Sequence, residues 1–171
     1  MKINILKISR CEGIKENFDI IDSNQHELIF NNQTFETLPH LSVKGYAVNY
    51  EGKIEVVLDI SAKVEMQCSR CIDTYVQDIH ASANHVFVKE GNQADEDEHL
   101  FKGDEIDLTE IVLNEIAAES PMKPLCSEYC KGLCPVCGKN NNKSNCNCKV
   151  GEIDSRLQIL KKLLDDEQGG V

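Results

Sequence analysis

Eight of the nine cysteines in this chain lie in four pairs whose spacing is typical of metal ligands. The pairs are Cys68 with Cys71, Cys126 with Cys130, Cys134 with Cys137, and Cys146 with Cys148. A structural zinc ion takes four ligands in a tetrahedron, so these thiolates are enough for two zinc ions. Four thiolates leave no coordination position for water or substrate. The pairs therefore predict two structural Zn²⁺ sites and no catalysis by the metal.

The last two pairs predict one site most clearly. In Cys134-Pro-Val-Cys137-Gly138, the proline favours a turn, and the glycine tolerates the positive φ that lets backbone N–H groups point at the sulfurs. Site 1 would then hold Cys68, Cys71, Cys126 and Cys130, and site 2 would hold Cys134, Cys137, Cys146 and Cys148. Spacing also leaves other groupings open, such as Cys126 and Cys130 with Cys134 and Cys137.

Other uses of cysteine fit the sequence less well. Disulfides need an oxidising compartment, but residues 1–10 alternate polar and apolar side chains and lack the apolar core of a signal peptide. No apolar run approaches the roughly 20 residues that span a bilayer, so we expect a cytoplasmic protein without a membrane partner. A redox-active Cys-x-x-Cys normally begins a helix, whereas Cys68 and Cys71 lie between two strand-like segments. Cys11 is interpreted as a small apolar side chain.

The charge is strongly acidic and unevenly placed. Lys and Arg number 18 against 29 Asp and Glu, which gives a net charge of −11 and favours a basic partner over broad binding to phosphates. Residues 90–110 hold nine acidic residues against one lysine, Lys102, and we interpret this stretch as a solvated linker. Residues 122–149 have the opposite balance. The candidate contacts to RNA or a partner there are Lys131, Lys139, Lys143 and Lys149.

Hydrophobic periodicity predicts a β-rich first half. Apolar residues alternate with polar ones over 54–66, as expected for a long strand with one buried face. Glu51-Gly52 before it predicts a tight hairpin with a strand over 43–50. A returning strand over 72–88 would place Cys68 and Cys71 at the tip of a second hairpin. Residues 2–9 and 17–22 are predicted as further strands.

Two helices are predicted after the acidic run. Asp107-Leu-Thr-Glu110 resembles a capping box before a helix that Pro121 and Pro124 would end. A second helix near Asp154 would present leucines on one side.

Together the patterns predict an α+β fold, with an antiparallel β-rich core, built as a meander or partly open barrel, two helices and an appended cysteine-rich zinc module. We expect the core over 1–88 with the Cys68/Cys71 knuckle, an acidic linker over 89–106, and a helix over 107–120 that packs on the core. The zinc-binding module would cover 121–150, and a C-terminal helix with a frayed tail 151–171.

The sequence offers little for an enzyme. Catalytic zinc keeps an open position and usually has histidine or carboxylate ligands, and no histidine of this chain is ligand-spaced with a carboxylate. There is also no phosphate-binding glycine-rich loop and no nucleophile elbow. We therefore expect a non-enzymatic protein without a small-molecule substrate.

Several motifs in order carry a resemblance. They are Cys68-Ser-Arg-Cys71-Ile72, a helix beginning at Asp107-Leu108, Lys123-Pro-Leu-Cys-Ser-Glu-Tyr-Cys-Lys-Gly-Leu-Cys-Pro-Val-Cys-Gly138, Cys146-Asn-Cys148 and Ile153-Asp-Ser-Arg-Leu157. This arrangement resembles the YceD family, known as large ribosomal RNA subunit accumulation proteins. The resemblance covers most of the chain and is most specific over 123–148. It departs at Asn141, where an apolar residue is expected, so the loop would be looser here.

The resemblance implies a bacterial cytosolic factor that supports synthesis, processing or accumulation of large-subunit ribosomal RNA. Its partners would be the pre-ribosomal large-subunit particle, a basic ribosomal protein, ribosomal RNA, or a combination of these. The resemblance brings no catalytic residues. The alternative is a zinc- or redox-responsive regulatory protein, because exposed thiolates can be oxidised and then release metal.

Overall fold

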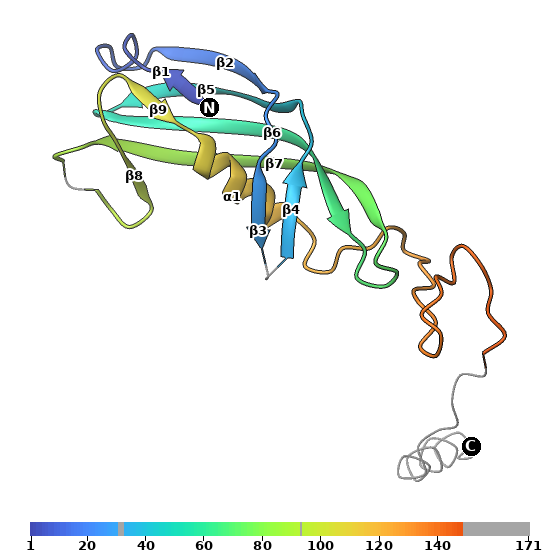
Figure 1. Cartoon of the computed structure of the whole chain (residues 1–171). Coiled ribbons are helices and arrows are strands. Elements are labelled where there is room, and N and C mark those ends of the chain that lie inside the picture. The colour runs from blue at the N-terminus through green and yellow to red at the C-terminus, as the bar shows by residue number, and fades with distance from the viewer. Residues whose placement is uncertain (31–32, 93, 149–171) are drawn as a thin grey trace, which may run out of the picture. The chain divides into compact units, whose positions relative to one another are not determined.

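The computed structural model describes residues 1–30, 33–92 and 94–148 (Figure 1). Contacts divide the chain into two compact units. The first unit consists of residues 1–69 and 73–128, and the second consists of residues 70–72 and 129–171, described as far as residue 148. None of the helices in these described ranges is long and apolar enough to cross a membrane.

The first unit is β-rich. Its strands are β1 (Lys2–Asn4), β2 (Lys15–Asp22), β3 (Glu27–Phe30), β4 (Gln33–Thr37), β5 (Leu41–Tyr50), β6 (Lys53–Gln67), β7 (Thr74–Lys89), β8 (Glu98–Phe101) and β9 (Glu105–Asp107), and its helix is α1 (Thr109–Glu119). β1 pairs with β9 in a small sheet, and the other seven strands form one larger sheet. Each recorded strand pair is antiparallel except β7 with β8. The predicted antiparallel β-rich core is therefore confirmed.

β6 is the central strand of the larger sheet. It pairs with β7 along one side, and with β5 and then β4 along the other. β2 extends the sheet beyond β5, and β3 extends it beyond β4. In Figure 1, β5, β6 and β7 run side by side as a meander of consecutive strands.

The alternation along β6 creates the core face. Successive side chains of a strand point to opposite faces, so the apolar set falls on one side of the sheet. All members of that set are buried: Ile54, Val56, Leu58, Ile60, Ala62, Val64 and Met66. The period-two prediction for 54–66 is thus confirmed.

Two local features fix how β5 lies against its neighbours. Glu51 and Gly52 both have positive φ, 52° and 80°, and Tyr50 pairs with Lys53 across them. Two positive φ values are those of a type I′ turn, which confirms the predicted tight hairpin. Within β5, a Cβ on Gly45 would lie 2.0 Å from the Val57 carbonyl oxygen, so only glycine fits there.

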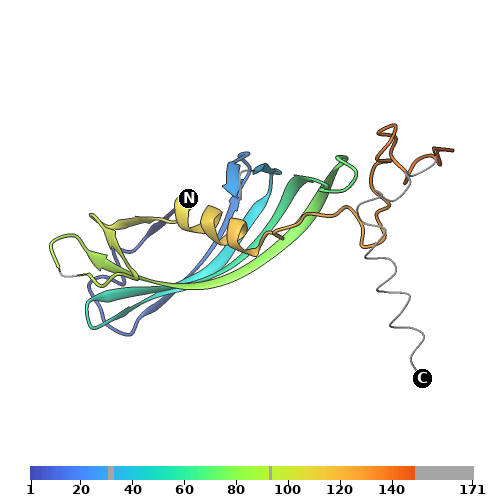
Figure 2. The same ribbon diagram turned by 90° about the horizontal axis from the view of Figure 1, so that it is seen from below.

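The helix α1 covers the core face of the sheet and packs on β7, β3 and β6 (Figure 2). Its apolar residues Ile111, Val112 and Ile116 are buried with those of β6. Asp107, just before the helix, accepts a hydrogen bond of 2.9 Å from the Thr109 N–H, but the N-cap residue of the helix is Leu108, which makes no side-chain cap bond, so only half of the predicted capping box is seen. The helix ends at Glu119, shortly before the first proline of the predicted stop signal.

The acidic stretch over 89–106 is not simply a linker. It contains β8, which pairs in parallel with the end of β7, and the beginning of β9. Phe101 and Ile106 are buried in the core, and Lys53 Nζ donates to Glu98 Oε1, a bond that holds the pKa of Glu98 below its usual value. The burial of Phe101 and Ile106 and the Lys53–Glu98 ion pair therefore hold this segment on the sheet, although its acidic composition predicts a solvated linker.

Three other expectations differ from the structure. The strand predicted over 2–9 ends at Asn4, and the chain then turns, with the Ser9 N–H donating to the Ile5 carbonyl at 2.8 Å. This turn lets Ile5 and Ile8 both be buried, whereas a strand would point them to opposite faces. The sequence patterns predict no strands where the structure has β3 and β4. One helix is present in the described ranges, where two were predicted, and the second predicted helix near residue 154 lies outside them.

Candidate metal centres

The first cysteine knuckle lies at the tip of the β6–β7 hairpin. The Cys68 N–H donates to the Asp73 carbonyl at 2.9 Å and closes the turn, and Ser69 N–H donates to the Pro124 carbonyl at 2.8 Å. Ile72 has a φ of 64°, which is left-handed backbone that a β-branched residue rarely adopts. The turn therefore accepts local strain directly after Cys71.

The structure brings the eight paired cysteines together in two groups of four. One group is Cys68, Cys71, Cys126 and Cys130, and the other is Cys134, Cys137, Cys146 and Cys148. Within each group the sulfurs all lie within 4.8 Å of one another. A tetrahedral zinc ion with Zn–S bonds of about 2.3 Å holds its sulfurs about 3.8 Å apart, so both groups fit such an ion. In the described ranges these are the groups of ligand-type side chains that could hold a metal.

The second knuckle is built by its own backbone. Gly138 N–H donates to the Cys134 carbonyl at 2.9 Å, and Cys134 N–H donates to the Lys139 carbonyl at 2.8 Å. Gly138 has the left-handed φ of 70° that the motif predicts. It occupies the position that Ile72 occupies in the first knuckle, one residue after the second cysteine.

Backbone N–H groups also set the protonation of this second group. The N–H groups of Cys137 and Val136 point at the Cys134 sulfur and lower the pKa of Cys134 to about 6. A hydrogen bond to the Cys137 sulfur, together with burial, raises the pKa of Cys148 to about 12. Near neutral pH the Cys134 thiol is therefore largely ionised, and the thiolate is the form of cysteine that binds a metal.

The two groups are joined within the second unit through Asn142. The Asn142 Nδ2 donates to the Cys130 Sγ at 3.2 Å, and its Oδ1 accepts from the Lys131 N–H at 2.8 Å. Asn142 lies in the loop between Cys137 and Cys146, so a loop anchored by one group supports a sulfur of the other. An amide that donates to a thiolate orients the ligand and stabilises its charge. The spacing of the cysteines gives no signal for this residue.

The loop around Asn141 is ordered by polar contacts. Asn141 is half-buried, its N–H donates to the Gly132 carbonyl at 2.9 Å, and its Oδ1 lies 3.9 Å from the Cys146 Sγ. Leu133 and Asn140 pair in an antiparallel bridge beside it. Asn141 therefore holds this loop through its polar contacts, where an apolar residue is expected to hold it by packing.

The second unit carries a basic and aromatic surface. Lys131, Lys139 and Lys143 are exposed, and Tyr129 is 87% exposed. The ranges 70–72 and 129–148 contain these lysines and Arg70 but no acidic residue. The remaining candidate contact, Lys149, lies outside the described residues.

A polar cluster outside the cysteines appears only in three dimensions. His85 Nε2 lies 3.0 Å from Glu115 Oε1, and His85 Nδ1 lies 3.2 Å from His99 Nε2. The three side chains come from β7, α1 and β8, so their spacing in the sequence does not reveal them. The cluster joins the helix to the sheet edge.

Comparison with known proteins assigns the family. A family model described as "Large ribosomal RNA subunit accumulation protein YceD" matches residues 56–164, which include all eight paired cysteines. The chain belongs to the YceD family. The uncharacterized protein YlbN of Bacillus subtilis is 31% identical over 159 residues, which cover 90% of this chain and 92% of YlbN.

A second relative matches only in part. The "Large ribosomal RNA subunit accumulation protein YCED homolog 1, chloroplastic" of Arabidopsis thaliana is 33% identical over 64 residues. That match covers 37% of this chain and 20% of the plant protein. No solved structure matches the chain.

Proposed function

We propose that this protein supports accumulation of the large ribosomal RNA subunit as a non-catalytic assembly factor that binds the pre-ribosomal particle. The observation that carries the proposal is the family match over 56–164, because the printed family description names this role. The name of the plant relative states the same role. The cysteine groups are consistent with a binding role, since a metal held by four thiolates has no position open to a substrate.

The ion proposed for both groups is Zn²⁺ in a structural role. Four thiolates suit zinc, and they also suit iron, so the metal must be measured on protein made at its native level. Elemental analysis should give about two zinc atoms per chain, one for each tetrahedral site. Iron in that material, or fewer than one metal atom per chain, would refute the assignment.

Two surfaces of opposite charge would divide the binding. The lysines and Tyr129 of the second unit suit RNA, because lysines contact phosphates and an exposed aromatic ring stacks on bases. The chain as a whole has a net charge of −11, which suits a basic ribosomal protein. Partner binding would thus combine a few RNA contacts with protein contacts.

Sedimentation of native-level tagged protein tests the proposal. Cell lysate is run through a sucrose gradient with and without RNase, and the protein is followed across the fractions. We expect it to move with precursors of the large subunit. Migration only as a free small protein under both conditions would refute the proposed function.

A matched pair of variants tests the RNA part. Glutamine in place of Lys131, Lys139 and Lys143 should weaken binding to the particle and reduce the salt slope by about 0.7–0.9 per lost phosphate contact. The control replaces three lysines of the first unit that each lie beside a carboxylate: Lys2, Lys7 and Lys102. An equal loss in the control would show a general charge effect.

A further inference from the structure

One side of β7 lacks a strand partner over most of its length. β6 pairs with β7 from Thr74 to Phe87, but β8 pairs with it only from Val86 to Lys89. Among the described residues, the far edge of β7 from Thr74 to His85 therefore has no paired strand. An open strand edge offers backbone donors and acceptors to another extended chain.

The register shows which backbone groups face that edge. Lys63 of β6 accepts a hydrogen bond from the Leu38 N–H at 2.7 Å, so the Lys63 backbone points away from β7. Lys63 is directly opposite Asp78, which makes them a non-hydrogen-bonded pair. The N–H and C=O of Asp78 must then point to the open edge, and those of Val76 and His80 do so by alternation.

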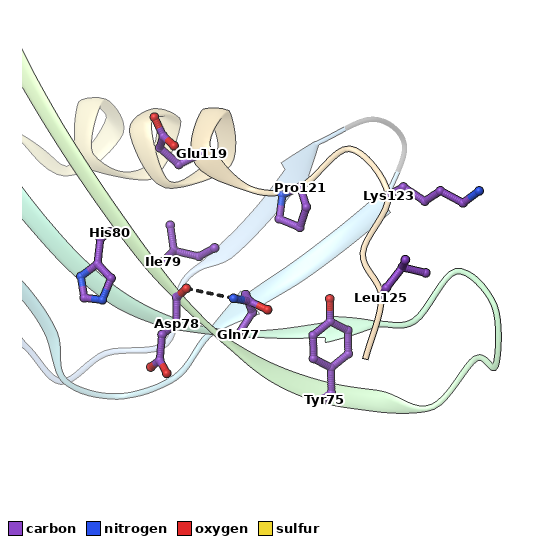
Figure 3. A pocket seen from close by; sticks show the side chains of 9 residues that line it. All are labelled: Tyr75, Gln77, Asp78, Ile79, His80, Glu119, Pro121, Lys123 and Leu125. Atoms are coloured by element: carbon purple, nitrogen blue, oxygen red, sulfur yellow. Dashed lines mark hydrogen bonds between the residues drawn. The ribbon is translucent and has the colours of Figure 1, made fainter. Parts of the chain in front are cut away.

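An independent contact agrees with this register. The Gln77 side-chain amide donates to the Asp78 carbonyl at 3.2 Å, so that carbonyl does face the open side (Figure 3). The protein thus covers one edge acceptor with its own side chain. A partner N–H could replace that side-chain donor.

A groove runs beside this part of the edge. It has a volume of 520 Å³, which is within the range of about 300–1,000 Å³ usual for binding sites. Its lining comes from β7 and from the chain at and after the end of α1: Tyr75, Gln77, Asp78, Ile79, His80, Glu119, Pro121, Lys123 and Leu125. Figure 3 shows these two segments on opposite sides of the groove. The Tyr75 hydroxyl accepts a hydrogen bond from the Leu125 N–H and so ties one side to the other.

We propose that this groove binds an extended basic segment of a protein partner, which adds to β7 as an extra strand between Val76 and His80. The ladder of backbone groups selects a polypeptide, because a nucleic acid does not offer alternating N–H and C=O groups at strand spacing. Asp78 and Glu119 line the groove together with Lys123, and Lys63 Nζ lies 4.0 Å from Asp78 Oδ1, so the lining itself is nearly balanced in charge. The net charge of −11 of the whole chain is what favours lysine or arginine side chains in the partner. Apolar side chains of the partner would pack on Tyr75 and Leu125. This inference rests on the proposed function and specifies the kind of protein contact it uses.

Amide hydrogen exchange of the zinc-loaded full chain tests the proposal. The probe is an acetylated and amidated eight-residue peptide that alternates lysine and valine. At saturation, it should slow exchange of the Val76, Asp78 and His80 N–H groups by about tenfold or more, and leave Gln77 and Ile79 unchanged because these already bond to β6. Absence of this alternating protection would overturn the proposal.

Control peptides separate strand addition from simple charge attraction. A peptide with N-methyl groups on the alternate residues that face β7 cannot form the ladder and should lose the protection. A glutamate–valine peptide should bind far more weakly. Equal protection by either control would overturn the proposal, and so would the same protection pattern produced by a ten-nucleotide oligouridylate. Protection that rises with protein concentration without peptide would show a second copy at the edge and would also overturn it.

Two substitutions test the groove residues. His80→Pro removes an N–H that faces away from β6, so the β6–β7 ladder stays intact while peptide binding should be lost. Glu119→Gln does not touch the backbone and should weaken binding about two- to fivefold, the effect of one exposed ion pair. Its control is Glu110→Gln, at the exposed start of the same helix. Equal weakening by both glutamine variants would contradict a role of the groove.

Sedimentation in cells separates this inference from the proposed function. If the parent protein moves with the large-subunit precursor and His80→Pro protein does not, both ideas are supported. If both proteins move with it equally, the open edge does not hold the particle, and this inference fails while the function stands. If the parent protein does not move with the precursor, the proposed function fails whatever the peptide shows.

Discussion

Replacing Asn142 with aspartate should weaken metal binding to the cysteine group that contains Cys130. The substitution keeps an oxygen to accept from the Lys131 N–H but removes the Nδ2–H that lies 3.2 Å from the Cys130 sulfur. Hydrogen bonds to charged groups are worth about 1.5–3 kcal/mol, and the lower value applies because Asn142 is exposed. The expected loss is therefore about tenfold in affinity, the lower end of the effect of outer ligand contacts.

The aspartate also adds a charge that raises this loss. A zinc ion with four thiolates carries a net charge of −2, so a carboxylate beside the sulfur is repelled by the loaded site. The affinity can be measured by titration with Co²⁺, whose absorption reports thiolate ligation, and by competition with a chelator for Zn²⁺. One of the two binding steps should weaken and the other should stay near the parent value.

The matched control is Asn145→Asp. Asn145 is exposed in the same loop, and this substitution makes the same change of charge. If it weakens binding as much as Asn142→Asp does, the effect is electrostatic and the N–H···S contact has no specific role. If Asn142→Asp protein binds both ions as tightly as the parent, the contact does not support the ligand and the reasoning is refuted.

Chelation of the metal should disorder residues 129–148 but leave the sheet folded, because that range has few buried apolar side chains. The amide NMR signals of 129–148 should lose their dispersion, while the β-sheet circular dichroism signal should stay unchanged. Ile72→Gly should raise the free energy of unfolding in urea by up to about 1 kcal/mol, since it relieves a left-handed φ at an exposed side chain; a lower value would mean the turn is unstrained. Asp22→Asn should destabilise at pH 6 and progressively less as the pH falls below about 4, because the Asn24 N–H and His26 lower the pKa of Asp22, and stability from a lowered pKa is lost as the pH falls through the folded-state pKa; a loss that does not shrink on acidification would exclude this origin. Gly45→Ala should cost about 1–3 kcal/mol or more, because its Cβ would meet the Val57 carbonyl; thermal unfolding unchanged from the parent would refute the close approach.

Strands could be predicted where the alternation of apolar and polar residues was long. The alternation over 54–66 has seven apolar members, enough to define a face, and every one of them is buried. β3 and β4 are short, with four and five residues, so they give too few repeats to be recognised. In 89–106, acidic composition concealed Phe101 and Ile106, whose burial orders the segment. The formation of a short strand depends on residues that are distant in the sequence, and a local pattern contains no information about them.

The cysteines show a similar limit. Spacing identified the ligand-type pairs, but it left several groupings open, because which pairs meet depends on where the hairpin tip and the chain after α1 lie in space. The contact of Ser69 with the Pro124 carbonyl is one of those that decide it. Asn142 could not be found, since asparagines are common in loops and only three-dimensional proximity separates this one from its neighbours.

The turns at the two ends of β6 have a consequence for how the chain folds. A two-residue turn fixes its pairing with β5, and the turn closed by Cys68 and Asp73 fixes its pairing with β7. A slip of one residue would bring the whole apolar face out to water, so a turn that fixes the register also keeps that face on the core side. The longest strands can therefore assemble from neighbours in the chain, without first closing a large loop. The N-terminal strands and the helix have more distant partners in the chain, so we expect them to join a sheet whose alignment is already set.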